Sequence, residues 1–183
     1  MKRKTSKASP KIKLTQPAAG RDHIQGPIDA PMTLLEYGDY ECPYCGDAHP
    51  IVKAVQKRLG DRLCFAFRNF PLVNSHPHAE HAAEAAEAAA TQGKFWEMHD
   101  ILYENQDSLE DENLAQYAAT LGLDADRLVR EVVAGAHIER IREDVQSGEE
   151  CEVNGTPTFF VNGVLYEGEP EVEALIGALA AGQ

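Results

Sequence analysis

Hydrophobic residues form two short continuous runs in the first half of the chain, PMTLLEYG (31–38) and RLCFAFRNF (62–70). Runs of this length, rich in branched and aromatic residues, are typical of buried strands. Between them, Ile51, Val52 and Val55 share one face at helical spacing, which predicts an amphipathic helix over residues 43–59. Strand, helix and strand in this order predict a βαβ unit with two parallel strands.

The middle of the chain has helical periodicity throughout. The first expected helix covers residues 78–90, where Glu80, Glu84 and Glu87 share one face and alanines fill the rest. Four more are expected: one over residues 94–105, one from a cap formed by Ser108 with Asp111 to about 121, one from an Asp124 cap to about 134, and one over 136–147.

The end of the chain returns to a strand pattern. TPTFFVNGVLYEG (156–168) predicts a β-hairpin, because Asn162–Gly163 is a strong type I′ turn signal. The last residues, from 169, have the periodicity of a helix. The predicted plan is therefore α/β: β-α-β, a helical insert, then β-β-α.

Charge is unevenly distributed along the chain. The 183 residues carry a formal charge of −13, yet residues 1–13 hold six Lys or Arg and no acid, which leaves −19 on the remainder. An acidic domain argues against nucleic-acid binding. The basic start, polar up to about residue 20, is expected to be a disordered, solvated tail.

Hydrophobic runs are too short to cross a bilayer, and the basic start lacks the apolar segment of a signal peptide. We therefore expect a cytoplasmic protein without membrane contact. An extracytoplasmic location is the alternative if the start of the chain is trimmed or misassigned. Four cysteines in a chain of this length do not indicate a disulfide-stapled scaffold.

The candidate chemistry lies at Cys42–Pro43–Tyr44–Cys45, a C-x-x-C sequence just after the first strand. Proline is favoured at the first position of a helix, which makes Cys42 the N-cap. The unpaired N–H groups of the first turn and the positive end of the helix dipole then favour its thiolate. Cys45, one turn in, is expected to be shielded and to react second. The acids Asp39 and Glu41 oppose a nearby anion, so we expect moderate activation.

Two other interpretations of the C-x-x-C remain open. A structural zinc site needs four ligands, and the candidates beside the pair are His49 and a loose cluster at 76, 78 and 81. The pair could also be two inert thiols at a helix start.

Several segments together resemble one family. LLEYGDYECPYC, FRNFPL, HPHAEHAAEAAEAA, GKFWEMHDILY and NGTPTFFVNG are similar, in this order, to DsbA-like disulfide oxidoreductases of thioredoxin fold. The resemblance implies a thioredoxin-like fold with an inserted all-helical subdomain. Its expected parts are a tail (1–20), a first part of the core (21–75), the helical insertion (76–152) and a second part of the core (153–183).

The resemblance also implies residue roles. Cys42 would be the exposed nucleophile, Cys45 the buried resolving thiol, and Pro157 a cis-proline facing the pair. Thr156 would offer its backbone as a strand edge to an extended substrate, beside Pro43 and Tyr44 of the dipeptide. Glu36, six residues before Cys42, would be a buried acid that exchanges a proton with Cys45.

The expected function is thiol–disulfide exchange with protein or peptide substrates. We expect a monomer that needs no metal or organic cofactor. A redox partner, which the sequence does not identify, must restore the dithiol after each reaction. Strong oxidants of the family have histidine at the position of Tyr44. Tyrosine lacks the cation that would stabilise the thiolate, so we predict a weaker oxidant. The alternative functions are a thioredoxin-fold binding module switched by its dithiol, and a zinc-stabilised domain.

Other singled-out residues have plainer expectations. Cys64 is expected to be a buried, inert thiol near the start of its strand, too far from Cys151 for a disulfide. Whether Cys151 is an auxiliary thiol stays open. His99 is expected to be packed and hydrogen-bonded, and Phe95 and Trp96 to belong to the core.

Overall fold

A computed structural model of the chain describes residues 17–182. Most of the predicted tail, residues 1–16, lies outside the described residues. No helix within them is long and apolar enough to cross a membrane.

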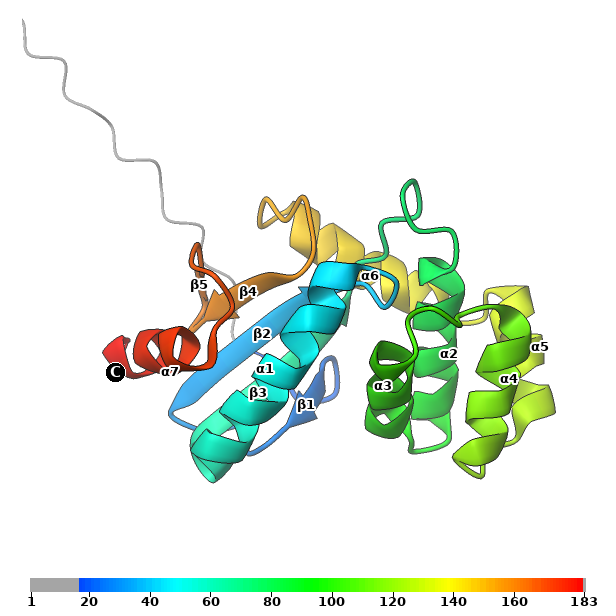
Figure 1. Ribbon diagram of the computed structural model, residues 1–183, viewed down its shortest axis with the longest axis horizontal. Helices are drawn as coiled ribbons and strands as arrows, with labels where there is room; N and C mark the ends of the chain where they lie inside the picture. Colours follow the sequence, from blue (N-terminus) through cyan, green and yellow to red (C-terminus); the bar gives the residue numbers. More distant parts are fainter. Residues whose placement is uncertain (1–16, 183) are drawn as a thin grey trace, which may run out of the picture.

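A five-stranded mixed sheet forms the centre of the molecule (Figure 1). Its order is β1-β3-β2-β4-β5, from strands β1 (His23–Gln25), β2 (Met32–Gly38), β3 (Leu63–Asn69), β4 (Thr158–Val161) and β5 (Val164–Leu165). β2 and β3 are parallel, as the predicted βαβ unit requires, and every other pair is antiparallel. β1 is not predicted by the hydrophobic pattern, because three half-buried residues are too few to show a period.

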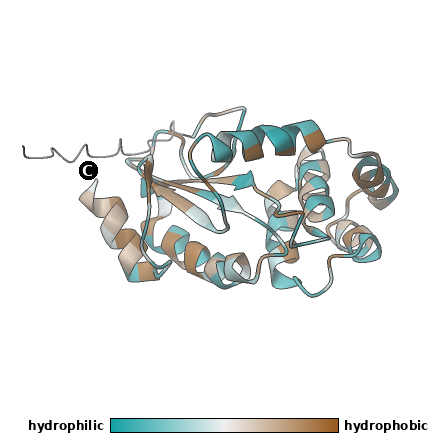
Figure 2. Cartoon of the chain, turned by 90° about the horizontal axis from the view of Figure 1, so that it is seen from above, coloured by the Kyte–Doolittle hydropathy of each residue, from teal (hydrophilic) through white to brown (hydrophobic). Residues whose placement is uncertain are grey.

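Helices cover both faces of the sheet. Side chains alternate along β2, so that Leu34 joins one core cluster with α1 (Pro43–Leu59) and α7 (Val172–Ala181). Leu35 joins a second, smaller cluster that includes Val145 of α6 (Ile138–Glu149). The sheet lies between helices, and α7 is largely hydrophobic along its length (Figure 2). A short 3-10 helix, η1 (Gly60–Arg62), links α1 to β3.

The helical insert follows β3, as predicted, and forms the opposite end of the molecule from α7 (Figure 1). Its first four helices are α2 (Ala79–Thr91), α3 (Phe95–Glu104), α4 (Asp111–Thr120) and α5 (Ala125–Ala134). The predicted range 76–152 also includes α6, which packs on the sheet. Asp124 caps α5 by accepting the Arg127 N–H, as expected. The predicted Ser108 cap of α4 is wrong, because the N-cap residue is Glu110, two positions further along the chain.

Buried polar groups join the insert and α6 to β3. The Asn69 side chain donates to Glu87 of α2 over 2.7 Å, and its backbone N–H donates to Asp144 of α6 over 3.0 Å. Asp144 is also paired with Arg140. Buried charges are tolerated when they are paired and hydrogen-bonded in this way. The contacts hold the insert against the end of the sheet from which α1 begins.

The β4–β5 hairpin has the predicted turn. Asn162 and Gly163 both have positive φ, 49° and 78°, as a type I′ turn requires. The Asn162 side chain also accepts the Thr33 N–H of β2 at 2.9 Å and donates to the Leu179 carbonyl of α7 at 2.9 Å. It therefore ties the turn to both β2 and α7.

Replacing Asn162 by glycine is expected to lower the free energy of unfolding by about 2 kcal/mol, since glycine keeps the positive φ but leaves Thr33 and Leu179 without these partners. Asn162→Ala should cost more, because it adds backbone strain to the same loss. Urea unfolding of wild type and the two variants measures both losses of stability. Equal stability of wild type and Asn162→Gly would contradict this role for the side chain.

Candidate active site

The start of α1 places the two cysteines of the C-x-x-C sequence. β2 ends at Gly38, and Cys42 is the N-cap residue with extended backbone (φ −73°, ψ 120°), followed by Pro43 at the first position of the helix. The Cys42 carbonyl accepts the N–H groups of Cys45 and Gly46 at 3.0 and 3.1 Å. The predicted helix start is confirmed.

Cys42 is not the exposed thiol that the family resemblance implied: only 3% of the residue is accessible. Its Sγ–H donates to the Thr156 carbonyl over 3.3 Å, so the loop before β4 covers the sulfur. Pro43 and Tyr44 are exposed around it, and Tyr44 has 72% of its surface accessible. All four cysteines are free thiols.

The two thiols have oppositely shifted pKa values. A hydrogen bond from Cys45 is the main cause that lowers the pKa of Cys42 to about 5, and it outweighs burial, which acts in the opposite direction. The Thr156 side chain and the first-turn N–H groups of Cys45 and Tyr44 lower it further. Burial raises the pKa of Cys45 well above its usual range. The pair therefore holds one thiolate and one thiol at neutral pH, which is the starting point for disulfide exchange.

The Thr156 hydroxyl has a specific place in this arrangement. Its oxygen is buried and has no hydrogen-bond partner within residues 17–182. Loss of the Cys42 proton turns the sulfur into an acceptor, and the hydroxyl is near enough to stabilise that anion. The peptide bond from Thr156 to Pro157 is cis.

Asp39 and Glu41, which we expected to oppose the thiolate, are engaged in local contacts. Asp39 accepts the Leu72 N–H at 2.8 Å and lies 2.7 Å from the His76 ring. Glu41 accepts the His78 N–H at 2.6 Å. Both carboxylates therefore fold the loop before α1 against the segment after β3, and the pKa of Cys42 is governed by the donors at its sulfur.

Glu36 lies on the α1 face of the sheet, because it is two residues from Leu34 on β2. It is 2% exposed, one of its carboxylate oxygens has no partner within the described residues, and burial raises its pKa to about 8. Its negative charge would raise the pKa of Cys45, so the two groups interact.

Gln106, in the loop between α3 and α4, is a residue that the sequence analysis missed. Its side-chain amide donates to the carbonyls of Tyr40 and Cys42, both at 2.8 Å. A Cβ on Gly46 would lie 2.0 Å from the Gln106 amide oxygen, so only glycine permits this approach. Gln106 therefore positions the first turn of α1 from the helical insert, more than sixty residues away, a distance no local pattern could reveal.

The histidines do not join the cysteines. His76 contacts Asp39, and His81 contacts Asp111 of α4. His99 is buried and hydrogen-bonded to the Tyr40 hydroxyl, as predicted. Within residues 17–182, the side chains close enough together to hold a metal ion are His49, His99 and Asp100, a group without either cysteine. The geometry thus gives no support to the zinc interpretation of the C-x-x-C.

The remaining cysteines lie apart from the pair. Cys64 is the second residue of β3 and fully buried, as predicted. Cys151 follows α6, packs half-buried against the second core cluster, and has a pKa that burial raises. Neither has the donors that activate Cys42.

Comparison with known proteins decides the family. The family model for thioredoxin matches residues 18–181. The chain belongs to the thioredoxin family. The structure is similar to a thioredoxin-like oxidoreductase from Silicibacter pomeroyi (26% identity, TM-score 0.79, covering 89% of this chain and 92% of that one). It is also similar to oxidised BdbD from Bacillus subtilis (23% identity, TM-score 0.79, covering 94% and 100%). The thioredoxin-like fold is confirmed. The same fold is found in alpha-DsbA1 from Wolbachia pipientis (19% identity, TM-score 0.76, covering 90% of this chain and 92% of that one).

Curated relatives of this thioredoxin-family chain carry another name. It is 46% identical over 165 residues to Na(+)/H(+) antiporter NhaA 1 from a Mycobacterium species (strain KMS), covering 89% of this chain and 27% of that protein. It is 48% identical over 161 residues to Na(+)/H(+) antiporter NhaA 3 from Salinispora tropica, covering 87% and 24%. The chain thus spans about a quarter of the length of the curated relatives it matches.

The thiolate of Cys42 is expected to titrate with a midpoint near pH 5, given the pKa of about 5. Thiolate absorbance at 240 nm, taken as the difference between reduced wild type and Cys42→Ser, measures it. Thr156→Val keeps the shape of the side chain but removes the hydroxyl, and should raise the midpoint by about one unit, a shift of about 1.4 kcal/mol. A midpoint above 8 in wild type would contradict the donor arrangement at the sulfur.

Proposed function

We propose that the chain catalyses thiol–disulfide exchange with protein or peptide substrates through the Cys42–Cys45 pair. The observation that carries this is the pairing of a stabilised thiolate at Cys42 with a buried, protonated thiol one turn further along α1. The similar structures support it, since one bears the name of a thioredoxin-like oxidoreductase.

In the reducing direction, the Cys42 thiolate attacks one sulfur of a substrate disulfide. The bond between the two substrate sulfurs breaks, the second leaves as a thiolate that takes a proton from water, and a mixed disulfide forms at Cys42. Cys45 then attacks the Cys42 sulfur, a Cys42–Cys45 disulfide forms, and the reduced substrate leaves. The same steps reversed oxidise a substrate dithiol.

Proton transfer accompanies the second step, because Cys45 must lose its proton before it attacks. Glu36 is a buried carboxyl with a pKa of about 8 on the same face of the sheet. We assign its ionised form as the group that takes this proton, and its protonated form as the group that returns it in reverse. Thr156, Pro157, Pro43 and Tyr44 form the substrate contacts around Cys42. A redox partner must restore the pair after each turnover, whichever direction it runs.

A redox titration tests the proposal. Wild type and Cys42→Ser are equilibrated in glutathione buffers of graded potential, the Cys42–Cys45 disulfide is quantified by mass, and turnover of a protein disulfide substrate is followed alongside. Wild type should form the disulfide and turn over; Cys42→Ser should do neither.

The outcomes separate the alternatives. Turnover that survives in Cys42→Ser refutes the proposed catalysis. A disulfide that forms without any turnover would instead support the binding module with a redox switch. The midpoint potential gives the direction. A thiolate of pKa about 5 stabilises the reduced form relative to a thiol of ordinary pKa and favours an oxidant, whereas Tyr44 in place of histidine favours a weaker one.

A further inference from the structure

A groove runs from the active-site loop to the start of α7. It has a volume of about 770 Å³, a size typical of ligand sites, and Thr156 and Pro157 form one end of it. Thr156 is the residue that hydrogen-bonds Cys42, so the groove opens directly beside the reactive sulfur. A substrate joined to Cys42 therefore has its neighbouring residues in or along this groove.

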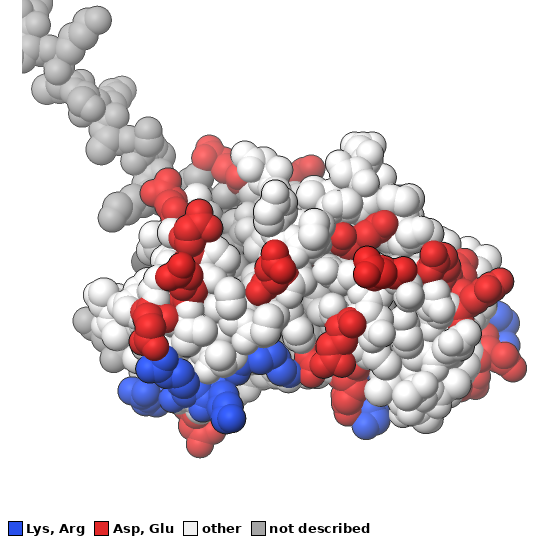
Figure 3. All heavy atoms as spheres, in the orientation of Figure 1, with Lys and Arg blue, Asp and Glu red and all other residues white. Residues whose placement is uncertain are grey.

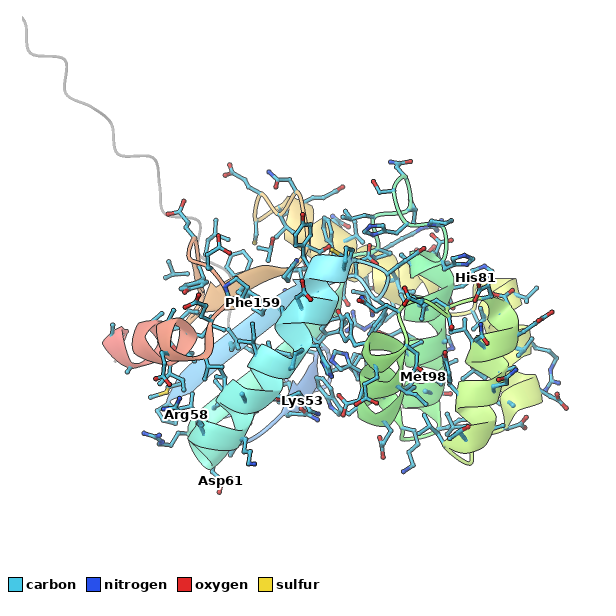
Figure 4. All side chains as sticks on the ribbon, viewed as in Figure 1. Lys53, Arg58, Asp61, His81, Met98 and Phe159 are labelled. Atoms are coloured by element: carbon cyan, nitrogen blue, oxygen red, sulfur yellow. The ribbon has the colours of Figure 1, made fainter. Side chains whose placement is uncertain are left out.

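The floor of the groove is apolar and comes from three elements. Ile51 of α1, Phe159 of β4 and Tyr166 after β5 line it, together with Pro157 and Leu165. Phe159 lies on β4, beside α1 (Figure 4). An apolar floor beside a strand suits an extended peptide, which pairs through its backbone and presents alternate side chains to the groove.

The rim of the groove is acidic. Its exposed carboxylates are Asp47, Glu152, Glu167, Glu169 and Glu171, and no Lys or Arg of residues 17–182 lines it. None of the five makes an ion pair within those residues, whereas nearby Glu173 is paired with Arg58. Acidic side chains gather over the hairpin and the start of α7, while Lys and Arg on the same face gather at the far end of α1 (Figure 3).

We propose, on the basis of the function proposed above, that this rim selects substrates in which Lys or Arg flank the reacting cysteine. Lys and Arg bury their aliphatic stems against an apolar surface while the charged heads reach outward, which matches an apolar floor below a carboxylate rim. The same carboxylates draw cationic peptides toward the groove and repel anionic ones, so the selection acts on both association and binding.

The test uses three peptides of one length, each with a single cysteine carried as a mixed disulfide with thionitrobenzoate and flanked on both sides by Lys, Gln or Glu. Attack by reduced Cys42 releases coloured thionitrobenzoate and joins the peptide to Cys42; Cys45 then displaces the peptide as a thiol. Wild type at low salt should react about tenfold or more faster with the Lys peptide than with the Glu peptide. About 0.5 M NaCl should reduce that ratio.

Two variants with equal changes in net charge locate the effect. Glu167→Gln/Glu169→Gln/Glu171→Gln should reduce the Lys-to-Glu rate ratio to about threefold or less. The control Glu112→Gln/Asp126→Asn/Glu143→Gln, on exposed positions of α4, α5 and α6, should keep the wild-type ratio. Equal rates for the three peptides in wild type overturn the proposal, and so does a control that loses as much selectivity as the groove variant.

A binding measurement separates the proposed specificity of the groove from the proposed catalysis by Cys42 and Cys45. The same peptides with serine in place of cysteine, carrying a fluorophore, are titrated with each protein by anisotropy. If thionitrobenzoate release does not depend on Cys42, the proposed catalysis is wrong. Preferential binding of the Lys peptide, lost in the groove variant only, would still support the cationic specificity of the groove, and its absence would refute it.

Discussion

Replacing Cys45 by serine is expected to stop exchange at the mixed disulfide. The Cys42 thiolate remains able to attack, since its sulfur keeps the Thr156 side chain and the first-turn N–H groups, and the serine hydroxyl can donate in place of the Cys45 thiol. Serine cannot form a disulfide, so the second step is lost and turnover falls to background. Intact mass after reaction with glutathione disulfide should show one glutathione per chain, retained at Cys42.

The matched control is Cys151→Ser, which removes a half-buried thiol outside the pair. It should turn over like wild type and accumulate no adduct at Cys42. Release of substrate at the wild-type rate by Cys45→Ser would mean that another thiol resolves the mixed disulfide. Loss of turnover in Cys151→Ser would identify that thiol and make Cys151 an auxiliary group.

Replacing Glu36 by glutamine is expected to stabilise the reduced protein at alkaline pH and to change little at acid pH. Burial raises the pKa of Glu36 from 4.5 to about 8 in the folded state. The folded protein thus holds a proton between these values that the unfolded chain has released, and stability falls as the pH rises through this window. The full difference is on the order of 4–5 kcal/mol, at 1.36 kcal/mol per pKa unit.

Glutamine has the same shape and no charge, so its unfolding free energy should lack this pH dependence. Urea unfolding of wild type and Glu36→Gln under reducing conditions, at pH 5 and pH 8.5, measures the difference directly. The two proteins should agree within about 1 kcal/mol at pH 5 and separate by several at pH 8.5. Exposed Glu112→Gln is the control, and it should show no such separation. A constant difference at both pH values would show that Glu36 is ionised throughout.

Local patterns predicted most of the fold. Continuous apolar runs marked β2 and β3, helical periodicity marked α1 and the insert, and Asn162–Gly163 marked the hairpin turn; all are confirmed. β1 was missed, and the cap of α4 was assigned to the wrong residue. Both depend on a few residues whose conformation is set by neighbours in space.

The sequence predicted which residues form the candidate site, but not the contacts that surround them. Cys42 at a helix start and Glu36 on the strand below are matters of spacing, and the structure has both there. The sequence does not show that Leu72 and His76 contact the Asp39 carboxylate, or that Cys45 and Thr156 lower the pKa of Cys42.

The face of α2 that carries Glu84 and Glu87 illustrates the same limit. Three glutamates on one helical face resemble a solvated surface, yet Glu84 and Glu87 are buried. Glu84 accepts the His137 N–H at 2.9 Å, and Glu87 accepts the Asn69 amide. Their partners are more than fifteen residues away in the chain, and only packing of α2 against α6 and β3 brings them together.

By itself the sequence determined the order of the elements, the helix start that activates a cysteine, and the identity of the reactive pair, because these follow from interactions within a few residues. Tertiary structure decided how that pair is presented. It covers Cys42 with Thr156, anchors its carbonyl with Gln106, gives Glu36 a pKa of about 8, and encloses an acidic groove beside the sulfur. Each of these features depends on burial or on a contact between distant segments of the chain. The spacing of nearby residues does not encode burial or such contacts.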